Sequence, residues 1–108
     1  MQKEEVQTLL ESEARAVSEI PVTDEFGKAV DLLYEYVHQR GGKLITCGMG
    51  KAGQIAVNMA TTFSSTGTPA VFLHPSEAQH GDLGILQEND IMLLISNSGK
   101  TREIQELI

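Results

Sequence analysis

The fold is decided by the stretch KLITCGMGKAG at residues 43–53. Residues 43–47 predict a short strand, and Gly48, Gly50 and Gly53 predict a tight turn that leads into a helix. That helix is expected to run to about Phe63, because apolar side chains then recur every four residues. A strand that passes through a glycine-rich loop into a helix is the typical opening unit of a parallel α/β sheet.

Two further units of the same kind follow. Residues 70–73 and 91–95 predict strands, and the second of these is apolar at every position, as is typical of a strand buried on both faces. Residues 76–79 match a capping box, which predicts a short helix opening there, and residues 102–108 open another helix. The order predicts a doubly wound α/β fold with a parallel sheet. Such sheets usually carry about five or six strands, so a chain that stops after the third predicts a truncated domain or one that a partner completes.

Two helices precede the sheet. Residues 4–19 predict an amphipathic helix that ends before Pro21. A second helix is predicted to begin after Thr23 as N-cap and to stop at Gly41-Gly42, where the chain turns left-handed. We therefore expect one domain over 1–108, with leading helices in 1–42 and the first three β/α units in 43–108.

Length and composition exclude several classes of protein. A chain of 108 residues with 41% hydrophobic residues is one domain with a packed core, and its single cysteine cannot form an internal disulfide. The net charge of −7 disfavours a nucleic-acid binder. No apolar run approaches the roughly 20 residues of a membrane span, and the N-terminus does not resemble a signal peptide. We expect a cytoplasmic protein with neither a nucleic-acid nor a membrane partner.

The loops at 48–53 and 96–101 each follow a strand and open a helix, which is where open parallel sheets bind ligands. Free helix amides and the hydroxyls of Ser96, Ser98 and Thr101 predict a phosphate site. Lys51 opposes the helix dipole by about 0.3–1 kcal/mol, and a bound anion would explain its position.

Alternatives remain open at this point. Residues 96–101 also suit an ordinary β–α turn, and 48–53 also match the dinucleotide fingerprint, although no acidic residue ends the second strand. Lys51 is also compatible with a solvated side chain, and Glu103 with a residue favoured by the helix dipole alone. The histidines that flank 76–79 are compatible with structural roles or with catalysis. Cys47 is interpreted as a small buried residue without a redox role.

Four motifs together resemble one family. They are GMGKAG at 48–53, STGTP at 65–69, HPSEAQHGDLG at 74–84 and SNSG at 96–99. The chain resembles the sugar isomerase (SIS) domain, and within it the D-arabinose 5-phosphate isomerases of the Kdo and capsule pathways. The resemblance implies a three-layer α/β/α sandwich and an isomerase of cytoplasmic lipopolysaccharide or capsule sugar metabolism. It would interconvert D-ribulose 5-phosphate and D-arabinose 5-phosphate through an enediol, without a required cofactor.

The resemblance also implies roles for individual residues. Lys51, His80 and Glu103 match the positions of the family's catalytic groups, and the choice between His80 and Glu103 as proton-abstracting base stays open. His74 matches a histidine that contacts substrate and an inhibitory zinc ion. Together with the loop chemistry, the expected substrate-binding residues are Gly48, Gly50, Gly67, Thr68, His74, His80, Ser96, Asn97, Ser98, Gly99 and Thr101.

The sequence departs from the family in three ways. Lys100-Thr101-Arg102 replaces the more usual Glu-Ser-Ser, a further glutamate and histidine of the family lie beyond residue 108, and no CBS modules follow. The 108-residue chain alone could therefore be inactive. A non-catalytic phosphosugar or nucleotide-sugar sensing module is the alternative function, although residues 1–42 lack a helix-turn-helix. We also expect a homo-oligomer, a dimer or a tetramer, and consider CMP-Kdo as a feedback ligand.

Overall fold

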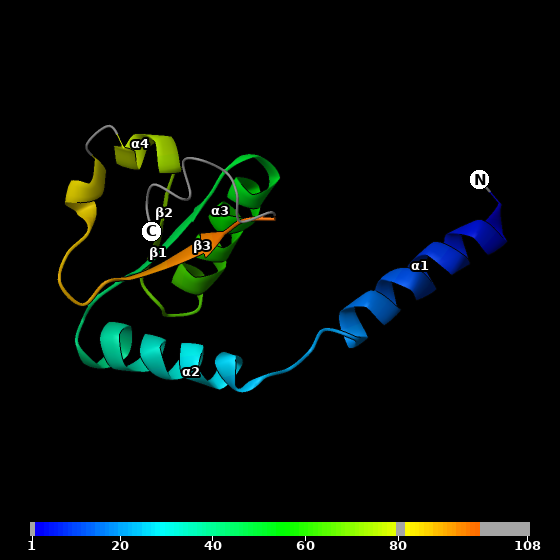
Figure 1. The fold of residues 1–108 in the computed structure, drawn as a ribbon, viewed down its shortest axis with the longest axis horizontal. Helices are drawn as coiled ribbons and strands as arrows, with labels where there is room; N and C mark the ends of the chain where they lie inside the picture. The colour runs from blue at the N-terminus through cyan, green and yellow to red at the C-terminus, as the bar shows by residue number, and fades with distance from the viewer. Residues whose placement is uncertain (1, 80–81, 98–108) are drawn as a thin grey trace.

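A computed structural model describes residues 2–79 and 82–97 of the chain (Figure 1). Among these residues, no helix has the length and apolar character that crossing a membrane requires. In chain order the elements are α1 Lys3–Ser18, α2 Asp24–Leu33, the π-helix η1 Tyr34–Gln39, β1 Leu44–Gly48, α3 Gly50–Ser65, β2 Ala70–Leu73, α4 Pro75–Gln79, the 3-10 helix η2 Asp82–Ile85 and β3 Ile91–Ile95.

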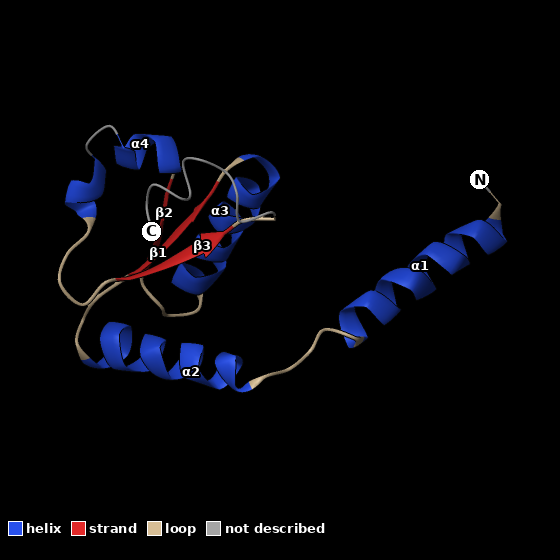
Figure 2. Cartoon of the chain, viewed as in Figure 1, coloured by secondary structure: helices blue, strands red, loops and turns tan. Residues whose placement is uncertain are grey.

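The three strands form a parallel sheet in the order β2-β1-β3 (Figure 2). Leu44 is aligned with Ala70 on one side and with Ile91 on the other, and the pairing continues to the ends of the strands. β1 has a neighbour on both sides, so all five of its residues are buried. The predicted α/β class, with a parallel sheet joined by helical crossovers, is confirmed.

The core lies on both faces of β1. On one face, the buried Thr46 hydroxyl donates a 2.6 Å hydrogen bond to the carbonyl oxygen of Ala56 in α3. The face of α3 that packs on the sheet permits this close approach, because its buried residues have small side chains or none, namely Gly53, Ala56 and Ala60. The alternation of side chains along a strand turns Ile45 to the other face, where it clusters with Leu73, Leu86 and Met92.

The predicted start and end of the second leading helix are confirmed, but its geometry changes along its length. The Thr23 hydroxyl accepts a hydrogen bond from the Glu25 amide, as an N-cap should, and Gly41 has a φ of +76°. The second leading helix changes to π geometry after Leu33. At the end of this π-helix, the Arg40 N–H donates to the carbonyl oxygen of Glu35, five residues earlier.

The short helix predicted at 76–79 is present, but Ser76 lies inside it and is not its N-cap. Helix α4 begins at Pro75, one residue before Ser76. Proline suits the first position of a helix, because the amide that it lacks would have no partner within the helix.

The full burial predicted for the third strand is wrong. Residues of β3 are mostly half-buried and Leu93 is 36% exposed, because among the described strands β3 pairs only with β1.

Helix α1 projects away from the sheet (Figure 1). The molecule measures 52 × 30 × 25 Å and its radius of gyration is 16.7 Å, against about 13 Å for a compact domain of this length. The predicted amphipathic helix is present, but none of its residues is buried. Leu9, Leu10 and Val17 are more than half exposed, so the described part of the chain leaves this face uncovered.

Candidate functional site

The carboxyl ends of the three strands meet at one edge of the sheet. Cys47 is aligned with Leu73 and with Leu94, and Gly48 with Ile95. The segments that leave the strands there begin at Met49, His74 and Ser96. The structure therefore brings together six of the predicted site residues at this carboxyl edge, namely Gly48, Gly50, Lys51, His74, Ser96 and Asn97.

The glycine loop is shaped by close backbone contacts. A Cβ on Gly48 would lie 2.8 Å from the Ala52 carbonyl oxygen, and a Cβ on Gly53 would lie 2.7 Å from that of Gly48. Gly50 has a φ of +59°, which favours glycine. These constraints bring the N-terminus of α3 directly against the end of β1. Its first turn holds no acidic residue, so its free amides and the positive end of its dipole can face an anion.

A pocket of about 440 Å³ lies between the start of α3 and the end of β3. Its volume falls at the lower end of the range typical of small-molecule sites. Lys51, Ser96 and Asn97 give it one cation and two side chains that can donate hydrogen bonds, and Ser96 is half-buried. Ala52, Ile55 and Ile95 supply the apolar part of the lining. Such a pocket can bind a small anionic molecule that also has polar hydroxyl groups.

Sequence reasoning identified the polar lining of this pocket but missed its apolar lining. Ile55 follows Lys51 by four residues in the same helix, so helical spacing could have placed the two side chains on one face. Ile95 ends a strand whose packing the sequence does not reveal.

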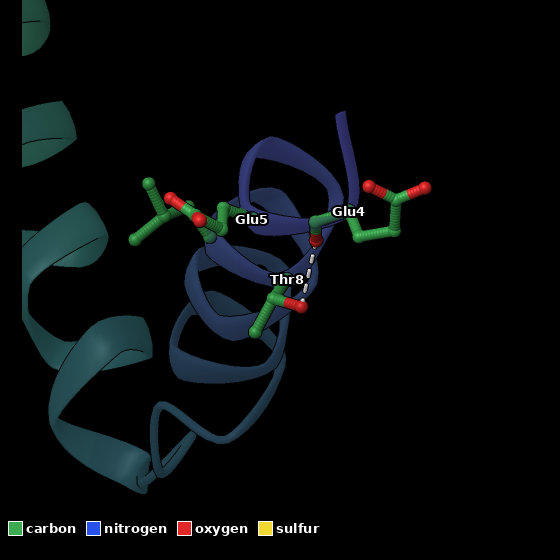
Figure 3. Close-up of a pocket in the computed structure, with 4 residues that line it drawn as sticks. Glu4, Glu5 and Thr8 are labelled. Carbon is green, nitrogen blue, oxygen red and sulfur yellow. Dashed lines mark hydrogen bonds between the residues drawn. The ribbon is translucent and has the colours of Figure 1, made fainter. Parts of the chain in front are cut away.

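A second pocket of about 440 Å³ lies along α1, lined by Glu4, Glu5, Thr8 and Leu9 (Figure 3). In this pocket the Thr8 hydroxyl donates a 2.9 Å hydrogen bond to the Glu4 carbonyl oxygen. Its two carboxylates would repel a phosphate. The pocket at the carboxyl edge is therefore the better candidate for an anionic ligand.

Two predicted site residues lie at the opposite edge of the sheet. Gly67 and Thr68 precede β2, beside the start of β1, where the Leu44 amide donates to the Pro69 carbonyl oxygen. Four strand residues at about 3.3 Å each separate them from the carboxyl edge. The Thr68 hydroxyl instead lies 3.0 Å from Nε2 of His38 in η1. Within one chain, β2 separates these two residues from the edge at which Lys51 lies.

The remaining predictions fall outside the described residues. They concern His80, Ser98, Gly99, Thr101 and Glu103, together with the departure at residues 100–102. Cys47 is buried at the end of β1, and this burial raises the pKa of its thiol to about 11, although a hydrogen bond from the Gly48 backbone partly opposes the shift. A thiol with so high a pKa is not a nucleophile near neutral pH, in keeping with its interpretation as a packing residue.

Fold and site together define a class: a parallel α/β protein with an anion-suited pocket where its strands end. Comparison with known families matches residues 35–108 to the SIS domain. The chain belongs to the SIS domain family.

Among curated relatives, the arabinose 5-phosphate isomerase KdsD of Yersinia pestis is 46% identical over 99 residues, which are 92% of this chain and 29% of the relative. KdsD of Shigella flexneri is 57% identical over 67 residues, which are 62% of this chain and 20% of the relative. The chain thus spans less than a third of the length of these relatives.

Solved structures show the same fold. A Bacteroides fragilis protein described as a phosphosugar isomerase involved in capsule formation is 72% identical, with a TM-score of 0.93 over 96% of this chain and 54% of that one. An Escherichia coli CFT073 protein in complex with arabinose 5-phosphate is 39% identical, with a TM-score of 0.82 over 98% of this chain and 57% of that one.

Proposed function

We propose that the protein containing this chain is a phosphosugar aldose–ketose isomerase that interconverts D-ribulose 5-phosphate and D-arabinose 5-phosphate. The observation that carries the proposal is the pocket in which Lys51, Ser96 and Asn97 meet the first turn of α3. The substrate is suggested by relatives named as arabinose 5-phosphate isomerases and by the arabinose 5-phosphate complex of the E. coli protein.

The substrate's phosphate is held at the segment that begins with Ser96. Hydroxyls of Ser96, Ser98 and Thr101 suit a tetrahedral anion, and Asn97 and Gly99 complete the loop. Gly50 leaves room for the sugar close to the N-terminus of α3, because no described atom lies within 4 Å of the position that a Cβ would take there. Binding energy from the remote phosphate then orients the reacting carbons.

The reaction moves a proton between C2 and C1 through an enediol. Lys51 stabilises the negative charge that develops on the carbonyl oxygen, since it is a cation that lines the pocket from the first turn of α3. His80 and Glu103 are the candidates for ring opening and for proton transfer, and the choice of base between them stays open.

No cofactor is needed for this chemistry. The protein would act in the cytoplasm and supply arabinose 5-phosphate to Kdo biosynthesis for lipopolysaccharide or capsule. CMP-Kdo, the activated product of such a pathway, is a candidate feedback ligand.

A homo-oligomer, a dimer or a tetramer, is part of the proposal. Its support is the uncovered apolar face of α1 and the position of Gly67 and Thr68 at the amino edge of the sheet. If these two residues contact substrate, as the resemblance implies, it must be the substrate of another copy.

Deuterium exchange tests the proposed activity. The full-length protein is incubated with arabinose 5-phosphate in heavy water, and an isomerase will introduce deuterium at C2. Lys51→Met is expected to slow this exchange by about 10²–10³-fold, the usual effect of losing one oxyanion-stabilising group. Lys28→Met removes an exposed lysine of α2 that pairs with Glu25, and should leave the rate unchanged.

The same experiment separates the isomerase from the alternative, a sensing module. Binding of arabinose 5-phosphate without any exchange at C2 would favour a sensor of phosphosugars. A Lys51→Met protein with the exchange rate of the wild type would remove Lys51 from the mechanism.

A further inference from the structure

His74 lies where β2 meets α4, and Ser76 fixes the environment of its ring. The half-buried imidazole packs edge-on against Phe72, with 6.4 Å between ring centroids and 79° between the planes. Its Nδ1 accepts a 3.1 Å hydrogen bond from the backbone amide of Ser76 and lies 2.7 Å from the Ser76 hydroxyl oxygen. Two potential donors of one residue therefore converge on one ring nitrogen.

This contact selects a tautomer. A backbone amide can only donate, so Nδ1 must turn its lone pair toward Ser76. A hydrogen on Nδ1 would instead point at the amide hydrogen. A neutral imidazole carries one ring hydrogen, which is then placed on Nε2. The Ser76 hydroxyl can add a second hydrogen bond to the same lone pair.

We propose that Ser76 is a positioning residue that holds His74 in the Nε2–H tautomer, so that His74 offers the substrate a hydrogen-bond donor and acts neither as a base nor as a metal ligand. Its position suits this role, since His74 follows the strand whose end is aligned with Cys47 and so lies at the carboxyl edge. The hydroxyl and carbonyl oxygens of a sugar phosphate are acceptors for such a donor. The part played in substrate binding rests on the isomerase proposed above, whereas the tautomer does not.

The same contact bears on the inhibitory zinc that the family resemblance implies at His74. Zinc binds an imidazole through an unprotonated ring nitrogen. Here Nδ1 is engaged by Ser76, and Nε2 carries the hydrogen. Within residues 2–79 and 82–97, no group of three or more His, Cys, Asp or Glu side chains could hold a metal ion. The described residues therefore do not fit a zinc site while the Ser76 contact is intact.

NMR of the full-length protein with ¹⁵N-labelled histidine tests the tautomer, at a pH that keeps imidazoles neutral. Comparison with His74→Gln assigns the His74 signals. In the wild type we expect Nδ1 to resonate as an unprotonated nitrogen and Nε2 as a protonated one. Ser76→Ala keeps the amide but loses the hydroxyl, so the minor tautomer should rise several-fold, roughly the effect of one hydrogen bond, and the two shifts should approach each other.

Two further variants and a zinc titration complete the test. Ser76→Thr keeps a hydroxyl and should restore the wild-type shifts, and Ser65→Ala, which removes a hydroxyl bonded to the Thr62 carbonyl at the far end of α3, should not alter them. The His74 signals of Ser76→Ala should respond to zinc at several-fold lower concentration than those of the wild type.

A hydrogen on Nδ1 in the wild type, or identical tautomer populations in the wild type and Ser76→Ala, would overturn the proposal. Because this readout needs no turnover, it can fail while the deuterium exchange experiment succeeds, and the reverse also holds.

Discussion

At the scale of single residues, Gly53 sets how closely α3 approaches β1. A Cβ at this position would lie 2.7 Å from the Gly48 carbonyl oxygen, and backbone atoms cannot yield as a flexible side chain can. The clash would push α3 away from β1 and so displace the start of α3, which forms one side of the pocket. The glycines of this loop are therefore needed for packing α3 against β1, and they also leave the helix amides accessible to an anion.

Substitution of this glycine tests the packing argument. We expect Gly53→Ala to lower the free energy of unfolding by about 1–3 kcal/mol, as overpacking usually does. Gly27→Ala is the matched control, because Gly27 lies in α2 with no described atom within 4 Å of the position of its Cβ. It should be neutral or stabilise by up to about 1 kcal/mol, since alanine favours a helix. Urea denaturation measures both, and equal effects would refute the packing role of Gly53.

Single residues differ in how far the sequence predicts them. Lys51, Ser96 and Asn97 could be placed at the pocket because loops after parallel strands converge at one edge. The contact between Ser76 and His74 could not be predicted, because it joins a backbone amide to a side-chain ring over two residues and leaves no periodic pattern. The motif instead suggested Ser76 as a helix cap.

At the scale of elements, a partly buried ion pair links the residue before β1 to the turn before β3. Lys43 Nζ lies 2.6 Å from Asp90 Oδ2, and the Lys43 amide donates to Asp90 Oδ1 at 2.9 Å. The Gln87 amide donates to the same carboxylate, which is only 4% exposed. Burial raises the pKa of Asp90, but the hydrogen bonds from Lys43 and Gln87 and the charge of Lys43 outweigh it, so the pKa falls below 3.8.

This pair predicts a pH dependence of stability. Because the pKa of Asp90 is lower in the folded state, its contribution is complete above the unfolded pKa near 3.8 and is lost as the pH falls through the folded value. At neutral pH, Asp90→Asn should lower the free energy of unfolding by about 2 kcal/mol, since the lost hydrogen bonds are charge-assisted. Urea denaturation from neutral pH down to below pH 3.8 should show the gap from the wild type closing in the acid range.

An exposed ion pair provides the control for this experiment. Glu25 pairs with Lys28 on the surface of α2, and its side chain is 75% exposed. Glu25→Gln should change the free energy of unfolding by less than about 1 kcal/mol at any pH. A gap between Asp90→Asn and the wild type that persists undiminished in acid would contradict the role of the charge.

Elements were predicted well where one pattern sufficed. The strand at 70–73 and the helix from the glycine loop could be found from apolar runs and spacing alone. The change from α2 to η1 could not be predicted, because no residue pattern marks π geometry. The buried residue of η1 is Val37. The edge position of β3 among the described strands likewise depends on which strands pair, and the sequence of one strand does not specify its neighbours.

At the scale of the whole molecule, the uncovered face of α1 is the feature that most needs a partner. The helix carries apolar side chains along its length but buries none of them. Exposed apolar surface of this kind usually marks an interface. A second copy of the protein is the partner proposed above, and the amphipathic pattern was visible in the sequence, whereas the projection of the helix was not.

A charge on this face tests the oligomer. In the full-length protein, Leu10→Glu should lower the mass in solution toward that of the monomer, because burying an unpaired carboxylate in an apolar interface is costly. Gln7→Glu adds the same charge to a polar position of the same helix and should leave the mass unchanged. Analytical ultracentrifugation reads out both variants. A Leu10→Glu protein with the mass of the wild type would exclude this face from the interface.

The central claim is that the segments leaving β1 and β3 bind one phosphorylated sugar between them. Hydrogen exchange of the full-length protein, measured by mass spectrometry over a titration with arabinose 5-phosphate, tests it most directly. Backbone amides in 48–55 and in 95–97 should become protected together, with one midpoint, while amides beside the α1 pocket at 4–9 stay unchanged. Protection of only one of the two segments, separate midpoints, or protection confined to α1 would contradict the account.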